Sequence, residues 1–324
     1  MAIAVTGGAG YIGSHTIKKM VQHGMIPVVY DNLSRGHIEA IPNFVAFEHI
    51  DLMDQKSLRE SFIKYKIDGI IHFAAFAYVG ESTLNPEMYF YNNTVGSLNL
   101  LKTMRQLEIN KIVFSSTCSI YGNPLDIPII EDSVVRPINP YAISKHMVEQ
   151  LIKEYESAYG IRYVILRYFN AAGASFEGEV GESHDPEPHL IPIVLSVASG
   201  QRESVIVYGA DYLTKDGSCI RDYVHVDDLA DAHIRALNYL QTGKDSTILN
   251  LGTGIGNSVF EVIKESELVT GRRISFSLGA RRVGDPDILV ADNQKAKMVL
   301  GWEPRYELKD IIESAWKWHN NKLY

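Results

Sequence analysis

Residues 2–31 read AIAVTGGAGYIGSHTIKKMVQHGMIPVVYD, and this stretch decides the fold. Ala2–Thr6 is apolar and predicts a strand, which runs straight into a turn with glycines at positions 7, 10 and 13. Ile12–Gln22 follows with the apolar spacing of a helix. In such a turn the first glycine allows a tight bend, the second lets backbone amides approach a pyrophosphate, and the third lets helix pack on strand. The stretch therefore predicts a dinucleotide site at a helix N-terminus.

The second expected strand, Ile26–Asp31, ends in a carboxylate eighteen residues beyond Gly13. A carboxylate at this place accepts hydrogen bonds from the ribose hydroxyls and repels a 2′-phosphate, which favours NAD over NADP. Arg35 lies nearby and keeps the NADP alternative open, because a cation there can accommodate that phosphate. At the end of the third strand, Asp51 and Leu52 are candidates for contact with the adenine, and a surface carboxylate is the alternative interpretation of Asp51.

Apolar runs alternate with amphipathic stretches along the chain, regularly up to Phe169. The remaining expected strands are Phe44–Ile50, Ile67–Phe73, Lys111–Ser116, Arg162–Phe169 and Thr247–Leu251. The remaining expected helices are Gln55–Tyr65, Pro86–Gln106 and Ala142–Tyr159. Most strands are apolar without strict alternation, as in a parallel sheet covered on both faces. We therefore predict an α/β fold, a Rossmann-type doubly wound parallel sheet with a smaller C-terminal substrate-binding α/β domain.

The alternation ends after Phe169, which indicates two domains. We expect residues 1–170 to form the nucleotide domain, with a return of residues 223–250, and residues 171–324 to form the second domain. Residues 176–189 (FEGEVGESHDPEPH) are acidic and contain glycine and proline, so they predict a long loop. An active-site lid and a solvated surface loop are both open interpretations of this segment.

Tyr141 and Lys145 are the candidate catalytic pair. They follow Asn139-Pro140, a typical helix start, and their spacing of four residues puts both on one helix face. An adjacent ammonium stabilises a phenolate and so lowers the tyrosine pKa from about 10 toward neutrality. The tyrosine can then take a proton from a substrate hydroxyl while hydride leaves the same carbon.

The fifth expected strand leads into Ser115-Ser116-Thr117-Cys118-Ser119, a hydroxyl-rich turn at the carboxyl end of a strand, where open α/β sheets bind ligands. Thr117 is a candidate bridge between a substrate oxygen and Tyr141. A local hydrogen bond within the turn is the alternative role for its hydroxyl.

Composition narrows the function further. The 324 residues carry a net charge of -8, which argues against nucleic acid or an anionic membrane as the main partner. No apolar run of about 18 residues exists, as a membrane span would need, and the N-terminus lacks a basic leader. Two cysteines, Cys118 and Cys219, cannot build a disulfide framework and favour a cytoplasmic location. We expect no metal site.

At this point the sequence resembles the extended short-chain dehydrogenase/reductases. The resemblance rests on the glycine turn, Asp31, Ser115-Ser116-Thr117 and Tyr141-x-x-x-Lys145. Further motifs along essentially the whole chain narrow the resemblance to the bacterial UDP-glucose 4-epimerase family. They are His72-Phe73-Ala74-Ala75, Val79-Gly80-Glu81-Ser82, Asn92-Asn93, Arg167-Tyr168-Phe169-Asn170, Arg221-Asp222-Tyr223-Val224-His225-Val226, Gly254-x-Gly256-x-Ser258-Val259 and Arg281-Arg282 with Asp285.

The resemblance implies an isomerase that oxidises carbon 4 of a UDP-sugar with tightly bound NAD, turns the 4-keto sugar over and returns the hydride. Tyr141 would be the acid/base, Lys145 would hold the nicotinamide ribose and Thr117 would support the hydroxyl. The implied NAD contacts are Gly7, Gly10, Tyr11, Ile12, Gly13, Asp31, Asn32, Asp51, Leu52, Phe73, Ala74, Ala75, Asn92, Ser115, Tyr141, Lys145 and Tyr168. The implied substrate contacts are Thr117, Tyr141, Phe169, Asn170, His189, Leu190, Arg221, Arg282, Asp285 and Leu289.

Some of these substrate residues carry open alternatives. The planar guanidinium groups of Arg221 and Arg282 suit a diphosphate, whereas a simple Arg282–Asp285 ion pair is the other interpretation of that spacing. His189 stands where relatives have an asparagine, and a role in uridine binding is a hypothesis. Leu289 stands where stricter members have tyrosine, so UDP-N-acetylglucosamine and UDP-N-acetylgalactosamine are further candidate substrates.

Rival functions remain at this stage. A 4,6-dehydratase typically carries Asp and Glu after the threonine, where this chain has Cys118 and Ser119. A decarboxylase is a further nucleotide-sugar alternative. A UDP-glucuronate 4-epimerase shares the same base chemistry, and an NAD-sensing regulator would not need Tyr141 and Lys145 together. The resemblance also implies a homodimer formed through the helices predicted at Pro86–Gln106 and Ala142–Tyr159, although apolar helix faces are often simply core.

Overall fold

The structure is a computed structural model that describes residues 2–282 and 285–324. The chain forms two compact units. Unit 1 comprises the chain up to Ile120, Pro137–Arg167 and Ala230–Leu249, and unit 2 comprises Tyr121–Arg136, Tyr168–Leu229 and Asn250–Tyr324. Compared with the predicted boundaries, the division falls close to residue 170, and residues 121–136 belong to unit 2.

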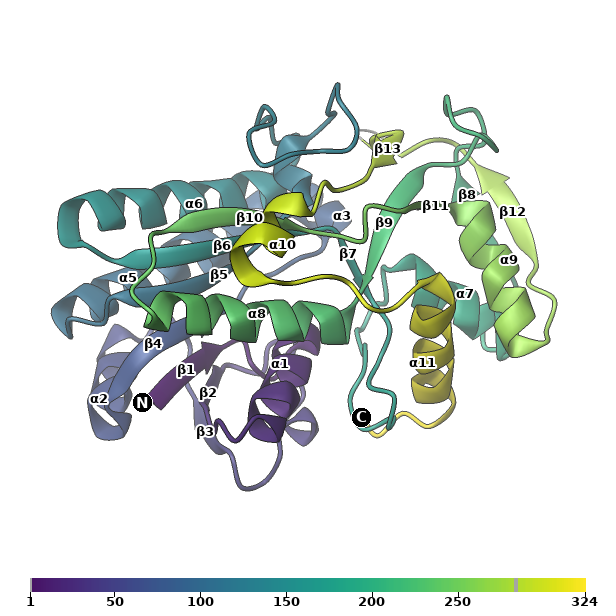
Figure 1. Cartoon of the computed structure of the whole chain (residues 1–324). Coiled ribbons are helices and arrows are strands. Elements are labelled where there is room, and N and C mark those ends of the chain that lie inside the picture. The colour runs from purple at the N-terminus through teal and green to yellow at the C-terminus, as the bar shows by residue number, and fades with distance from the viewer. Residues whose placement is uncertain (1, 283–284) are drawn as a thin grey trace. The chain divides into compact units, whose positions relative to one another are not determined.

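Unit 1 is built on a seven-stranded sheet in the order β3-β2-β1-β4-β5-β6-β10 (Figure 1). The pairs β1–β2, β2–β3, β1–β4 and β4–β5 are parallel. The order 3-2-1-4-5-6 is that of a doubly wound dinucleotide-binding sheet. The strands are β1 (Ala2–Thr6), β2 (Val28–Asp31), β3 (Ala46–His49), β4 (Ile67–His72), β5 (Lys111–Thr117), β6 (Arg162–Tyr168) and β10 (Thr247–Leu251).

Helices cover both faces of this sheet. Side chains alternate along β5, so Ser116 faces α6, where it bonds Glu149, and Ser115 faces α8, where it bonds His233. Apolar residues of α2, α5 and α6 pack on the α6 side, around Phe62, Leu100 and Ile152. The helices are α1 (Tyr11–Gln22), η1 (Ile38–Ala40), α2 (Gln55–Tyr65), α3 (Val79–Leu84), α4 (Pro86–Tyr89), η2 (Phe90–Val95), α5 (Gly96–Gln106), α6 (Pro140–Tyr159) and α8 (Val226–Gln241).

The segment predicted as one helix, Pro86–Gln106, is divided in the structure. It forms α4, the π-helical turn η2 and α5. Asn93 in η2 explains why the regular helix is interrupted, because its buried side chain bonds the backbone of Phe76 in both directions and also Ser144. These partners lie far along the chain, and local spacing does not reveal them.

Unit 2 combines small sheets with three helices that pack on one another. β9 (Ile220–His225) pairs with β7 (Asn170–Ala172), β11 (Gly256–Ser258) and β13 (Ile288–Leu289), and β8 (Val205–Tyr208) pairs with β12 (Phe276–Gly279). The helices α7 (Leu190–Ala198), α9 (Val259–Thr270) and α11 (Leu308–Asn320) lie together (Figure 1). η3 (Cys118–Tyr121) and α10 (Gln294–Leu300) complete the elements.

The core of unit 2 lies among these three helices and β9. Ile191 and Leu195 of α7, Val262 of α9 and Ile311 of α11 are buried together with Tyr223 of β9. This packing fixes the start of α7 and the residues of β9, which carry several of the candidate substrate contacts. No helix of the described residues is long and apolar enough to cross a membrane.

Candidate active site

The glycine turn joins β1 to α1 in a backbone path that excludes side chains at two positions. Gly7 has a φ of 72°, and a Cβ there would lie 2.4 Å from the backbone nitrogen of Ala74. A Cβ at Gly13 would lie 2.4 Å from the carbonyl oxygen of Gly7. At Gly7 the turn therefore lies against the chain that follows β4, a contact that the sequence analysis did not predict.

The N-terminus of α1 directs its first peptide N–H groups out of the helix. Gly10 is the N-cap, no side chain of the described residues caps it, and the first turn holds no acidic residue. Backbone donors at a helix start form a positive site for phosphate oxygens. Tyr11 and Ile12 are the first two residues of this helix.

Asp31 stands at the end of β2, beside this turn. Its carboxylate accepts hydrogen bonds from the backbone N–H groups of Ala9 at 2.9 Å and Leu33 at 2.8 Å. Only 8% of the residue is exposed, and this burial raises the pKa of the carboxyl group although both backbone bonds oppose the shift. Each oxygen retains a lone pair for a further hydrogen-bond donor.

The neighbouring residues form a polar rim. Asn32 donates to Asp51 at 2.7 Å, and the other oxygen of Asp51 accepts the backbone N–H of Met53. Arg35 pairs with Glu81 at 2.6 Å and lies over the ring of Tyr78 at 4.7 Å. The cation that kept the NADP alternative open is therefore already bound to a carboxylate.

The end of β4 also lies against β1. The backbone N–H groups of Phe73 and Ala74 both donate to the carbonyl of Thr6. His72 bonds Thr6 and Ser97 through its two ring nitrogens. Burial, with a smaller effect of the Lys145 charge, lowers the pKa of His72 to about 3, so it is a neutral packed histidine.

Tyr141 and Lys145 stand in the first two turns of α6, on one face of the helix. Asn139 caps this helix by accepting the N–H of Ala142 at 2.9 Å, and Pro140 occupies its first position. Tyr141 is 8% exposed and Lys145 is 3% exposed. The predicted pair is therefore held rigidly at a helix start.

The ammonium group of Lys145 is deeply buried. It lies 4.6 Å from the centre of the Phe114 ring. Burial lowers its pKa from 10.5 to about 7, and the negative charge of Glu149 one turn later partly opposes that shift. A lysine so desolvated is poised to gain or lose its proton near neutral pH, which is typical of functional sites.

Sequence reasoning missed the group that fixes this helix face. Glu149 accepts hydrogen bonds from Arg167 at 3.0 and 2.7 Å and from Ser116 at 2.6 Å, and all three residues are buried. The spacing of four residues between Lys145 and Glu149 was the signal that could have revealed it. The ion pair ties α6 to β5 and β6 behind the Tyr141–Lys145 pair.

Two hydroxyl residues of β5 have partners of their own. Ser115 bonds His233 at 2.9 Å. The hydroxyl of Thr117 accepts the backbone N–H of Ser119 and donates to its side chain, both at 3.1 Å. The local turn role, which was the alternative interpretation for Thr117, is thus present, and the oxygen retains one further lone pair.

Apart from Thr117 and Tyr141, which belong to unit 1, the candidate substrate residues lie in unit 2, where β9 and the segment after β12 carry the cations. Arg221 is 9% exposed and forms an ion pair with Asp285, whose backbone N–H donates to the carbonyl of Arg282. Arg282 itself lies over the ring of Tyr208 at 4.1 Å. The partner of Asp285 is therefore Arg221, from a distant part of the chain.

Asp222 follows Arg221 in the sequence motif of residues 221–226, and its contacts are with the protein backbone and Thr253. Its buried carboxylate accepts bonds from Thr253 at 2.6 and 2.7 Å, from Gly254 and from the backbone of Ala291. Leu289 of β13 pairs with Arg221 in the sheet and is 7% exposed. This network fixes the backbone on either side of Arg221.

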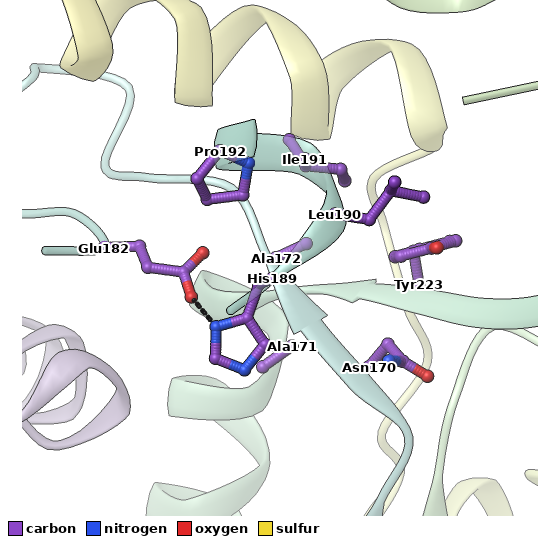
Figure 2. A pocket seen from close by; sticks show the side chains of 9 residues that line it. All are labelled: Asn170, Ala171, Ala172, Glu182, His189, Leu190, Ile191, Pro192 and Tyr223. Carbon is purple, nitrogen blue, oxygen red and sulfur yellow. Dashed lines mark ion pairs between the residues drawn. The ribbon is translucent and has the colours of Figure 1, made fainter. Parts of the chain in front are cut away.

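A pocket of unit 2 lies where β7, β9 and the start of α7 meet (Figure 2). Asn170, His189 and Tyr223 line it together with Leu190. His189 faces Glu182 through Nδ1 at 2.6 Å. Phe169 directly precedes Asn170 in the chain, and its backbone N–H donates to the carbonyl of Leu251. Tyr168 and Asn92, two of the predicted NAD contacts, are half-buried. The pocket thus gathers several predicted substrate residues, but not Arg221 or Arg282.

The doubly wound sheet, the glycine turn and the buried tyrosine–lysine pair define a dinucleotide-dependent enzyme of the short-chain dehydrogenase/reductase type. More specifically, the chain belongs to the NAD dependent epimerase/dehydratase family, whose model matches residues 3–252.

Relatives and solved structures cover the chain almost completely. It is 49% identical to the UDP-glucose 4-epimerase of Lacticaseibacillus casei over 322 residues, covering 99% of this chain and 97% of the relative. It is similar to the UDP-glucose 4-epimerase of Brucella ovis in complex with NAD, with a TM-score of 0.95, 46% identity and 97% of each chain covered. It is also similar to the Bifidobacterium longum enzyme in complex with NAD+ and UDP, with a TM-score of 0.93, 36% identity and 99% coverage of each chain.

Proposed function

We propose that this protein is a UDP-glucose 4-epimerase, which interconverts UDP-glucose and UDP-galactose through a 4-keto sugar. The observation that carries the proposal is the rigid Tyr141–Lys145 pair at the head of α6, with Lys145 buried. The similarity to named UDP-glucose 4-epimerases over nearly the full chain supports the choice of reaction within the family. A role in galactose metabolism follows from this reaction.

NAD is the cofactor that the residues of unit 1 fit. The uncapped start of α1 suits a pyrophosphate, and Asp31 retains acceptor capacity for ribose hydroxyls. The pairing of Arg35 with Glu81 favours NAD over NADP, because that cation already has a carboxylate partner. The residues proposed to contact NAD are Gly7, Gly10, Tyr11, Ile12, Gly13, Asp31, Asn32, Asp51, Leu52, Phe73, Ala74, Ala75, Asn92, Ser115, Tyr141, Lys145 and Tyr168.

The chain's own residues supply the proton chemistry. In our proposal Tyr141 takes the proton of the sugar's 4-hydroxyl and later returns it to the oxygen of the 4-keto sugar. Lys145 as a cation stabilises the phenolate, and Glu149 favours this cationic form because its charge raises the lysine pKa. Thr117 uses its remaining lone pair to orient the hydroxyl. Bound NAD would supply the hydride acceptor and donor for carbon 4.

Unit 2 would hold the rest of the substrate. A diphosphate needs fixed cations, and Arg221 with Arg282 provides two guanidinium groups whose forks match phosphate oxygens. Asp285 would accept the uridine ribose hydroxyls once its pairing with Arg221 is shared with the ligand. The remaining proposed contacts are Phe169, Asn170, His189, Leu190 and Leu289. The sugar must turn over, so strong contacts are expected at the UDP end and weak ones at the sugar.

The size of Leu289 bears on substrate breadth. Leucine is smaller than the tyrosine found at this place in stricter members of the family, so we propose that UDP-N-acetylglucosamine and UDP-N-acetylgalactosamine are also accepted. UDP-glucuronate 4-epimerisation is the alternative function, because it uses the same Tyr141 chemistry and requires only recognition of an added carboxylate.

A homodimer is part of the proposal. Tyr91 and Val95 of η2 and Met147 of α6 are exposed apolar side chains, and η2 and α6 pack on one another. Such a patch on the helices that the family pairs supports a two-fold interface. Cys118 and Cys219 are not disulfide-bonded to one another, which supports a reducing, cytoplasmic location.

The test compares UDP-galactose, UDP-N-acetylglucosamine and UDP-glucuronate as substrates without added NAD. We expect turnover of UDP-galactose, and absence of turnover with all three would refute the proposed function.

In Tyr141→Phe turnover should fall by about 10²–10⁴-fold, with NAD still bound. The matched control, Tyr159→Phe on the last turn of the same helix, should keep wild-type turnover. Wild-type turnover in Tyr141→Phe would refute the assigned acid/base.

A further inference from the structure

A second cluster of reactive side chains lies in the segment between β7 and α7, apart from the Tyr141–Lys145 pair. Its members are Glu182, His184, Glu187 and His189, and we call it the His2Glu2 cluster. One ligand atom from each residue lies within 4.8 Å of the other three. All four residues belong to unit 2. Two imidazoles and two carboxylates converging in this way resemble the ligand set of a transition metal.

The separations in the cluster suit ligands around one small cation. His189 Nδ1 lies 2.6 Å from Glu182 Oε1 and 3.0 Å from Glu187 Oε1. His184 Nδ1 lies 3.2 Å from Glu182 Oε1 and 3.5 Å from Glu187 Oε2. Zinc bonds of roughly 2.0–2.2 Å in a tetrahedron place neighbouring ligand atoms about 3.3–3.6 Å apart. The two distances from His184 Nδ1 are close to that length, whereas the two from His189 Nδ1 are hydrogen-bond lengths that would have to widen around an ion.

Hydrogen bonds alone explain this convergence less well. A protonated Nδ1 points its single hydrogen in one direction, yet each Nδ1 here faces both Glu182 and Glu187. The two imidazole rings lie 5.3 Å apart, so two charged imidazoles would repel one another. A divalent cation would bind both neutral Nδ1 atoms and be balanced by both carboxylates.

The surrounding contacts hold the ligands in place. Glu182 is 6% exposed, and its carbonyl accepts the indole N–H of Trp318 at 2.9 Å. Gly181 packs directly against the same indole ring. His189 is the N-cap of α7, and its backbone N–H donates to Glu187 at 3.0 Å. The cluster is thus built on a fixed loop and a helix start, and such outer contacts orient metal ligands.

We infer that the His2Glu2 cluster binds one Zn2+ per chain, through Nδ1 of both histidines and one oxygen of each carboxylate. The two imidazoles favour zinc over Mg2+ or Ca2+, which prefer oxygen ligands. Four protein ligands complete a tetrahedral shell, which is typical of structural zinc. The site departs from our expectation that the chain has no metal site.

The ion would link residues 182–187 to the start of α7. With Nδ1 of His189 bound to zinc, its Nε2 carries the proton and becomes a fixed hydrogen-bond donor. His189 lines the pocket with Asn170 and Tyr223, and its Nδ1 faces the carboxylate of Glu182 (Figure 2). His189 would therefore act on substrate with a set tautomer. This second effect rests on the proposed function, whereas zinc binding does not.

The experiment uses the full chain, with zinc content measured after purification and again after chelator treatment and titration with Zn2+ or Co2+. We expect one ion per chain and a Co2+ visible spectrum of the tetrahedral type. His184→Ala and Glu182→Gln should weaken zinc affinity by more than about 100-fold, since loss of an outer partner alone costs 10–100-fold. The matched controls are Glu179→Gln, an exposed carboxylate of the same loop, and His23→Ala, an exposed imidazole; both should bind as wild type.

Three outcomes would overturn the inference: no stoichiometric binding, equal binding by wild type and His184→Ala, or an octahedral Co2+ spectrum. Circular dichroism of each variant verifies that the fold is retained. Zinc binding is measured without substrate, so its failure is distinguishable from failure of the proposed reaction. In the active wild type, chelation should raise KM for UDP-galactose more than it lowers kcat. An unchanged KM would refute the effect on His189 while leaving the zinc site standing.

Discussion

Replacing Lys145 by methionine tests the burial of its ammonium group and its proposed role in catalysis. Methionine has nearly the same length and shape without the charge, so it removes the ionisation while largely keeping the packing. The ammonium group lies 4.6 Å from the Phe114 ring centre, and Glu149 and His72 are the ionisable neighbours that interact with it. His72, with a pKa of about 3, does not titrate between pH 6 and 9. The substitution should abolish turnover and yet stabilise the cofactor-free protein.

The magnitude follows from the lowered pKa. Burial takes the pKa of Lys145 from 10.5 to about 7. Below pH 7 the lysine is charged in the folded and in the unfolded state. Each unit by which the pKa is lowered corresponds to about 1.36 kcal/mol, so the buried charge costs the folded state about 5 kcal/mol. Between pH 7 and 10.5 the unfolded state binds more protons, so wild-type stability rises with pH. The stability advantage of Lys145→Met should therefore shrink by about 3 kcal/mol from pH 6 to 9.

The assay is urea unfolding of cofactor-free wild type and variant at several pH values, followed by far-ultraviolet circular dichroism. Lys102→Met is the matched control, because Lys102 is exposed on α5. Its free energy of unfolding should differ from that of wild type by the same amount at every pH. The reasoning would be refuted if the difference in unfolding free energy between Lys145→Met and wild type stayed constant from pH 6 to 9. It would also be refuted by a variant that is less stable than wild type at pH 6.

The remaining predictions concern the frame of the site. Glu149→Gln leaves the Arg167 guanidinium buried without its carboxylate and should lower the unfolding free energy by about 3–5 kcal/mol; a loss near zero in urea unfolding would contradict the role of the ion pair. Gly13→Ala places a Cβ 2.4 Å from a backbone oxygen and should destabilise by at least about 2 kcal/mol, whereas Gly80→Ala, which meets nothing within 4 Å in α3, should be neutral or stabilising. Asp31→Asn should weaken NAD binding about 10–100-fold by calorimetry, as expected for charge-assisted bonds of 1.5–3 kcal/mol; an unchanged affinity would contradict its ribose role.

The elements that the sequence predicted best are those fixed by local chemistry. At Gly13 the glycine turn is constrained by its own residues, because a Cβ there would meet the carbonyl oxygen of Gly7, and β1 spans Ala2–Thr6 as predicted. The start of α6 was predictable because Asn139 and Pro140 are local helix signals. Helical spacing alone put Tyr141 and Lys145 on one face, and the structure adds the burial that shifts the lysine pKa.

Long-range contacts decided the features that the sequence did not reveal. The predicted helix Pro86–Gln106 is interrupted because Asn93 bonds Phe76 and Ser144, which no periodicity encodes. Asp285 pairs with Arg221, far away in sequence, although Arg282 was its nearer candidate. Residues 176–189 predicted a long acidic loop, either a lid or a surface loop, and the convergence of two histidines with two glutamates required tertiary structure.

The central claim is that carbon 4 of the sugar is oxidised and reduced again on one enzyme molecule. In the most direct measurement, the purified protein converts UDP-galactose that carries deuterium at carbon 4, without added NAD. The UDP-glucose formed is analysed by mass spectrometry and NMR. The account predicts UDP-glucose that retains the deuterium at carbon 4 and takes up none from solvent deuterium oxide at that carbon. UDP-glucose that has lost the label to solvent, or no conversion at all, would contradict it.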